Sequence, residues 1–146
     1  MNFLEFCNYK FKNTDEKQKI VNNLANCYKK IKGRSCFRTS LEPGQSSSFV
    51  ISLLSEFYKT KDQSFNSYLE VGVFFGGSLC ALYDSGFTGD VYGLDIYQGY
   101  YGSFDKIGLG QRFPSAIKNS DEHMRIVSEN CAIFGGCPTL IKANTQ

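Results

Sequence analysis

A glycine-rich turn that begins with an acidic residue is the segment of this sequence best suited to ligand chemistry. It reads Glu70-Val-Gly72-Val-Phe-Phe-Gly76-Gly77-Ser78. Gly72 permits a sharp turn out of a strand, while Gly76 and Gly77 let the backbone approach a ligand closely. The N–H groups that begin the following helix favour a negative group, and Ser78 adds a hydroxyl donor. The turn therefore predicts a binding site for a ligand with an anionic group.

A second acidic residue, Asp95, ends the next apolar run of the sequence. In folds of this kind, an acidic residue at that strand end accepts hydrogen bonds from ribose hydroxyls, about 20 residues beyond the glycine turn. A glycine turn alone is weak evidence, because many strand–helix turns contain glycine for steric reasons. Together with Asp95 it predicts a nucleoside site.

Two residues in the turn narrow the choice of nucleoside. Phe74 occupies the second glycine position of the dinucleotide fingerprint, where a bulky side chain opposes close approach of a pyrophosphate, and this argues against a dehydrogenase-like domain. Ser78-Leu79 does not provide the Lys-Ser/Thr pair of a Walker A loop. A ligand with an amino group and a carboxylate but no phosphate suits Glu70 and the helix start. S-adenosylmethionine is such a ligand, although Glu70 could instead pair with a nearby base.

Three segments carry a resemblance to a known family. Leu69-Glu-Val-Gly-Val-Phe-Phe-Gly-Gly-Ser-Leu79 resembles the first motif of class I S-adenosylmethionine-dependent methyltransferases, and is most similar to the macrocin O-methyltransferase and cephalosporin hydroxylase-like branch. Tyr92-Gly-Leu-Asp-Ile96 resembles the second motif, and Thr139-Leu-Ile-Lys-Ala-Asn144 resembles the third strand. The resemblance covers roughly residues 45–146 and is strongest over 68–96.

The resemblance implies both a function and a set of site residues. It implies that Glu70 and Gly72 lie beside the methionine part, that Asp95 binds ribose and that Ile96 flanks adenine, with Asn144 as a looser assignment. It also implies methyl transfer to an oxygen of a small molecule, such as a sugar or natural product. The alternative is a non-catalytic nucleoside-binding or interaction module with the same fold.

The elements that must position this site follow from hydrophobic periodicity. Apolar residues at 4-3-4 spacing predict a helix over 17–31 with one buried stripe, and Asn13 to Asp15 form its cap. Its stripe is Ile20, Leu24, Cys27 and Ile31. A second helix over 47–58 is expected to bury Phe49, Leu53, Leu54 and Phe57. Further along, the pattern predicts strands over 67–73, 91–96 and 138–143, and a helix over 76–85. It also predicts a helix capped by residues 119–121, with one face formed by Met124, Val127 and Cys131.

This order of elements predicts an α/β fold in two regions. Residues 1–60 form an N-terminal helical region, and residues 61–146 form a Rossmann-like parallel sheet with flanking helices. Class I methyltransferase sheets have seven strands, so the resemblance implies a sheet truncated after the third strand. An open sheet edge favours self-association into a homo-oligomer. We also expect that this chain alone transfers no methyl group.

Composition excludes several other classes of function. The 146 residues carry a formal net charge of +2, which gives no support for binding nucleic acid or anionic lipid. No apolar stretch approaches the ~20 residues that span a bilayer, and the first residues lack the pattern of a signal peptide. The six cysteines and one histidine lack metal-site spacing. We therefore expect no metal, reduced thiols and a cytoplasmic location.

Two further features invite a catalytic interpretation. His123 is the only histidine, and we expect it on a helix surface in a solvated or packing role rather than as a general base. The aromatic segment 97–104 could close over the ligand as a lid, but aromatic residues in a long loop more often pack back onto the domain. No catalytic residue is assigned from the sequence.

Overall fold

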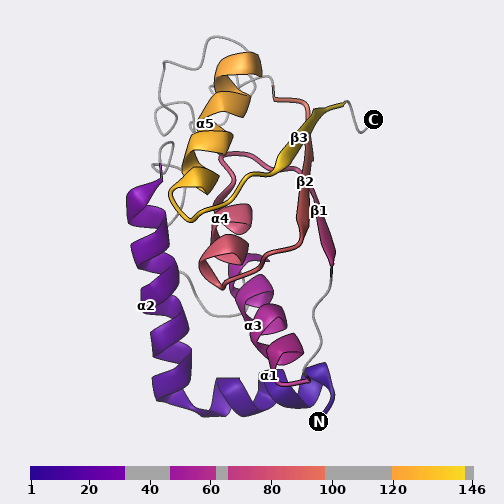
Figure 1. Ribbon diagram of the computed structural model, residues 1–146. Coiled ribbons are helices and arrows are strands. Elements are labelled where there is room, and N and C mark those ends of the chain that lie inside the picture. The colour runs from indigo at the N-terminus through magenta and orange to yellow at the C-terminus, as the bar shows by residue number, and fades with distance from the viewer. Residues whose placement is uncertain (32–46, 62–65, 98–119, 144–146) are drawn as a thin grey trace, which may run out of the picture.

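The computed structural model describes residues 1–31, 47–61, 66–97 and 120–143, and these residues form an α/β fold (Figure 1). Within them lie five helices and one parallel sheet of three strands. In chain order the elements are α1 (Phe3–Lys12), α2 (Thr14–Lys30), α3 (Ser47–Lys59), β1 (Ser67–Val71), α4 (Gly77–Asp84), β2 (Asp90–Asp95), α5 (Ser120–Ala132) and β3 (Thr139–Lys142).

The N-terminal helices begin at asparagine caps. The Asn2 side chain accepts from the Glu5 N–H, and the Glu5 carboxylate accepts from the Asn2 N–H, which together form a capping box. This helix, α1, was not expected from the sequence pattern. Asn13 caps α2 by accepting from the Glu16 N–H at 3.2 Å, as predicted for that segment.

The apolar stripe predicted for α2 is confirmed, since all four of its residues are buried: Ile20, Leu24, Cys27 and Ile31. On α3, Leu53 is buried as predicted, whereas Leu54 and Phe57 are half-buried. The Phe57 ring packs against Phe3 and Phe6 of α1 at centroid distances of 5.4 and 5.5 Å. The predicted burial of Phe49 remains a prediction, because its side chain is not among those that the structure describes.

The three strands pair in the order β1-β2-β3, and both pairs are parallel. Glu70 is aligned with Gly93, which is in turn aligned with Leu140. The parallel α/β arrangement predicted from the sequence is therefore confirmed for the described residues. Each strand is slightly shorter than or offset from its predicted range; β1 ends at Val71 because Gly72 has a φ of +84° and leaves the extended conformation.

The two faces of the sheet differ in their surroundings. The described helices all lie on one side of the strands, where Val91, Gly93 and Asp95 of β2 are buried (Figure 1). On the opposite face, Leu69 and Val71 are each 59% exposed. No helix within the described ranges combines the length and apolar character needed to span a membrane.

Candidate functional site

The turn between β1 and α4 is shaped by backbone conformations that only some residues adopt easily. Gly72 has a φ of +84°, and its N–H donates to the Leu94 carbonyl at 2.9 Å, so the turn stays attached to β2. A Cβ at Gly72 would have no atom within 4 Å, so conformation alone requires glycine there. At Gly76, with a φ of +78°, a Cβ would lie 3.1 Å from Val127 Cγ1. Gly76 therefore also serves the close packing of α5.

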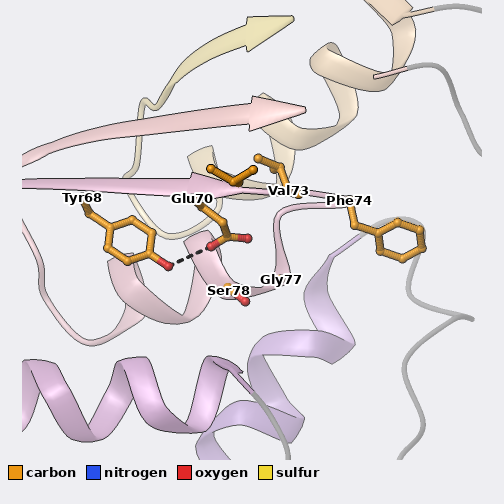
Figure 2. Close-up of a pocket in the computed structure, with 8 residues that line it drawn as sticks. Tyr68, Glu70, Val73, Phe74, Gly77 and Ser78 are labelled. Carbon is orange, nitrogen blue, oxygen red and sulfur yellow. Dashed lines mark hydrogen bonds between the residues drawn. The ribbon is translucent and has the colours of Figure 1, made fainter. Parts of the chain in front are cut away.

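This turn encloses a pocket of about 260 Å³ at the end of β1 and the start of α4. Of the residues predicted from the sequence, the structure brings Glu70, Gly72, Gly77 and Ser78 together in its lining. The remaining lining residues are Tyr68, Val71, Val73 and Phe74. Figure 2 shows the Glu70 carboxylate pointing toward the first turn of α4, where Ser78 lies, and the Phe74 ring pointing away from it.

Glu70 is the carboxyl group of this pocket. The Tyr68 hydroxyl donates to Glu70 Oε2 at 3.0 Å (Figure 2). Burial raises the pKa of Glu70 to about 7; the hydrogen bond from Tyr68 lowers it and the negative charge of Asp95 raises it further. A carboxyl group whose pKa is shifted in this way inside a pocket is typical of a functional site. It is suited to accepting from a cationic or hydrogen-bond-donating ligand.

Asp95 ends β2 beside the turn but does not line the pocket. Its side chain is 5% exposed. The Phe74 N–H donates to Asp95 Oδ2 at 2.9 Å, and the Tyr97 N–H donates to Asp95 Oδ1 at 3.0 Å. These bonds use two of the roughly four acceptor positions of the carboxylate. In this arrangement Asp95 holds two backbone segments together.

The two residues tied to Asp95 are also the described non-glycine residues with positive φ. Phe74 has a φ of +55° and Tyr97 a φ of +44°. This conformation costs an L-residue about 1–2 kcal/mol. The hydrogen bonds to Asp95 offset part of that cost, so the carboxylate stabilises a strained backbone beside the pocket.

Two other predicted site residues lie elsewhere. Ile96 follows Asp95, and its side chain is 36% exposed, so part of it is accessible to a ligand. Asn144 lies outside the described residues. Of the aromatic segment 97–104, the structure describes Tyr97, which is fully buried and donates its hydroxyl to the Gly93 carbonyl at 2.9 Å. Tyr97 therefore packs onto the domain, and the lid interpretation of residues 98–104 falls outside the described residues.

The expected position of His123 on a helix surface is wrong. His123 is 1% exposed, and its Nε2 lies 2.7 Å from the Phe74 carbonyl oxygen. Its ring also packs against Phe75 and Tyr97, each at a centroid distance of 5.4 Å. The physical reason is that the turn after β1 lies against α5 and covers this residue. His123 therefore has the packing role that the sequence interpretation left open.

Asn130 is a residue of this region that the sequence interpretation missed. It is fully buried, and its Nδ2 donates to the Phe75 carbonyl at 3.0 Å. His123, Val127 and Asn130 are spaced four and three residues apart, so they share one face of α5. The spacing of His123 and Asn130 relative to Val127 could have indicated from the sequence that both polar residues are buried. It was overlooked because hydrophobic periodicity considers apolar residues alone. The other predicted members of this face, Val127 and Cys131, are buried, and Met124 is half-buried.

Comparisons of the chain with protein-family models, with curated proteins and with solved structures found no match. Among the described residues, no group of three or more His, Cys, Asp or Glu side chains is arranged to hold a metal ion. The candidate site is therefore defined by its own geometry. It consists of a pocket with one ionisable carboxyl group, next to the beginning of a helix and a strained turn held by buried polar side chains.

Proposed function

We propose that this chain binds S-adenosylmethionine in the pocket between Glu70 and Ser78, and that it supplies cofactor binding for a small-molecule O-methyltransferase with a Rossmann-like fold. The observation that carries the proposal is the position of the Glu70 carboxylate. It lies in a pocket formed where a parallel strand ends and a helix begins, which is where ligands bind in open α/β sheets.

The amino-acid end of the ligand fits the residues that line this pocket. Glu70 would accept from the ammonium group, and a bound cation stabilises the ionised carboxylate. The first turn of α4, with Gly77 and Ser78 in the lining, would face the ligand carboxylate, because helix N-termini favour anions. The bound sulfonium supplies an electrophilic methyl group, and the contribution of the chain is to hold it in orientation for an acceptor oxygen.

The ribose end depends on Asp95. Two backbone N–H groups already occupy its carboxylate, so a ribose hydroxyl would use one of the remaining acceptor positions or displace one of these bonds. Because Asp95 is already occupied in this way, the second candidate function is a non-catalytic nucleoside-binding or interaction module with the same fold. The Phe74 ring points away from the first turn of α4 (Figure 2), so its bulk does not decide between S-adenosylmethionine and a dinucleotide, and titration with NAD does.

Calorimetric titration of the chain with S-adenosylhomocysteine, S-adenosylmethionine, adenosine and NAD tests the proposal. We expect the two S-adenosyl compounds to bind, and affinity to rise with pH through about 7, because the ammonium group requires an ionised Glu70. Glu70→Gln should weaken binding about tenfold, the scale of losing a charge-assisted hydrogen bond. Asp90→Asn, which removes an equal charge at the exposed start of β2, should leave affinity unchanged.

A separate incubation concerns catalysis. Labelled S-adenosylmethionine and a panel of hydroxylated acceptors test whether this chain alone transfers a methyl group. We expect no transfer, and transfer of label would exclude the non-catalytic module and contradict that expectation. In the titration, binding of NAD without binding of S-adenosylhomocysteine would contradict the proposed S-adenosylmethionine site.

A further inference from the structure

We propose that His123 is a positioning residue for the ligand pocket: its imidazole holds the Phe74 carbonyl and so fixes the strained turn that forms one wall. The identity of the ligand in this inference rests on the proposed function. The action of His123 on the turn does not. His123 is absent from the pocket lining, so it acts through Phe74 rather than by touching the ligand.

Phe74 is held at both ends of its backbone. Its N–H donates to Asp95 Oδ2 at 2.9 Å, and its carbonyl lies 2.7 Å from His123 Nε2. A carbonyl oxygen can only accept, so Nε2 must carry a proton and donate. The two bonds come from β2 and α5 and meet on a residue with a φ of +55°. They hold this residue in a conformation that its side chain does not favour.

The donor itself is rigid. The His123 ring is 1% exposed and is enclosed by Phe75 and Tyr97, each 5.4 Å away between ring centroids. Asn130, two turns further along α5, donates to the Phe75 carbonyl at 3.0 Å. The helix therefore holds two successive carbonyl groups of the turn with buried polar side chains. Because the His123 ring is buried, a solvent molecule does not readily take the place of the lost donor.

Release of the Phe74 carbonyl would have a direct consequence for the pocket. Val73 and Phe74 line it together with Gly77 at the start of α4. Without the bond from His123, the Phe74 backbone is held less firmly in its positive-φ conformation, and the part of the lining formed by Val73 and Phe74 can shift. A histidine that only filled space in the core would affect global stability and leave the shape of this wall unchanged.

Two substitutions at one position separate these roles. His123→Phe keeps an aromatic ring between Phe75 and Tyr97 but removes the donor. His123→Gln places an amide N–H at the same number of bonds from the backbone as Nε2 and retains it. Arg125→Gln, on the exposed face of the same helix, is the matched control. Each variant is examined by amide hydrogen exchange of residues 70–79, by melting temperature and by S-adenosylhomocysteine titration.

We expect His123→Phe to accelerate exchange in residues 70–79 and to lower affinity about tenfold, the effect of losing one buried hydrogen bond. His123→Gln should restore both measurements, and Arg125→Gln should change neither. Unchanged exchange in residues 70–79 of His123→Phe would overturn the proposal, whatever its melting temperature. If the parent chain binds no S-adenosylhomocysteine, the proposed function fails, and the exchange data still decide whether His123 holds the turn.

A measurement on the parent protein keeps the test independent of variants that do not fold. Since the sequence contains one histidine, its imidazole gives a single set of nitrogen signals in NMR. We expect a protonated Nε2 whose hydrogen exchanges slowly with solvent. An unprotonated Nε2, or one whose hydrogen exchanges at the rate of an exposed imidazole, would overturn the proposal.

Discussion

Glu70 and Asp95 sit at the ends of neighbouring parallel strands, yet the structure places them in different environments. Glu70 lines a pocket and accepts one hydrogen bond from the Tyr68 hydroxyl. Asp95 is buried outside that lining and accepts from two backbone N–H groups. The pKa of Glu70 is raised to about 7, chiefly by burial. One carboxylate is therefore available for a ligand, while the other stabilises the turn beside it.

The contrast arises from what surrounds each strand end. Tyr97 lies two residues after Asp95, and Phe74 lies in the turn that faces it; both residues direct N–H groups to the carboxylate from positive-φ conformations. Gly72 lies two residues after Glu70, but its N–H donates to the Leu94 carbonyl instead. Backbone donors stabilise the charged form of a carboxylate, and burial without them destabilises it. The two carboxylates therefore differ in whether backbone N–H groups already donate to them.

The largest expected effect comes from removing the carboxylate that holds the turn. Asp95→Ala should lower the free energy of unfolding by about 2–4 kcal/mol, because it leaves two N–H groups without their acceptor beside strained residues. Urea denaturation checks this value, with Asp90→Ala at the exposed start of the same strand as the control. If Asp95→Ala lowers the free energy of unfolding no more than Asp90→Ala does, Asp95 does not stabilise the turn and does not differ from Glu70 in this way.

Removal of the Glu70 carboxylate should instead raise the free energy of unfolding. Folding raises the pKa of Glu70 from 4.5 to about 7, so the folded state binds more protons and loses stability as pH rises across that window. Glu70→Gln should therefore match the parent near pH 4.5 and exceed it at pH 8, by up to about 3 kcal/mol. Denaturation curves at both pH values check the difference. A gain that is equal at the two pH values would not arise from ionisation.

The smallest expected effect is a shift in the pKa of Glu70 when the Tyr68 hydroxyl is removed. In the parent protein, the hydrogen bond from Tyr68 to Glu70 Oε2 lowers the pKa of the Glu70 carboxyl group. Tyr68→Phe removes this bond. We expect the pKa of Glu70 to rise above about 7 by roughly one unit, the equivalent of one hydrogen bond. Carbon NMR of the Glu70 carboxyl group during a pH titration measures it. A decrease in pKa would show that Tyr68 does not favour the ionised form.

The sequence alone determined the elements and their order. The stripe of Ile20, Leu24 and Cys27, the cap at Asn13 and the individual strand segments follow from local spacing, and the order of these elements predicts the parallel sheet. Periodicity predicts such features because each depends on residues a few positions apart. The same local reasoning grouped Glu70, Gly72, Gly77 and Ser78 into one pocket, because they lie on one strand, one turn and the start of one helix.

Only the tertiary structure decided how the buried polar groups are paired. The contact between His123 and the Phe74 carbonyl, and that between Asn130 and the Phe75 carbonyl, join residues far apart in the chain. Local spacing carries no information on which carbonyl a side chain meets. The roles of Asp95 and His123 were fixed when α5 packed against the turn and excluded water, since a buried polar group must then find its partner within the protein.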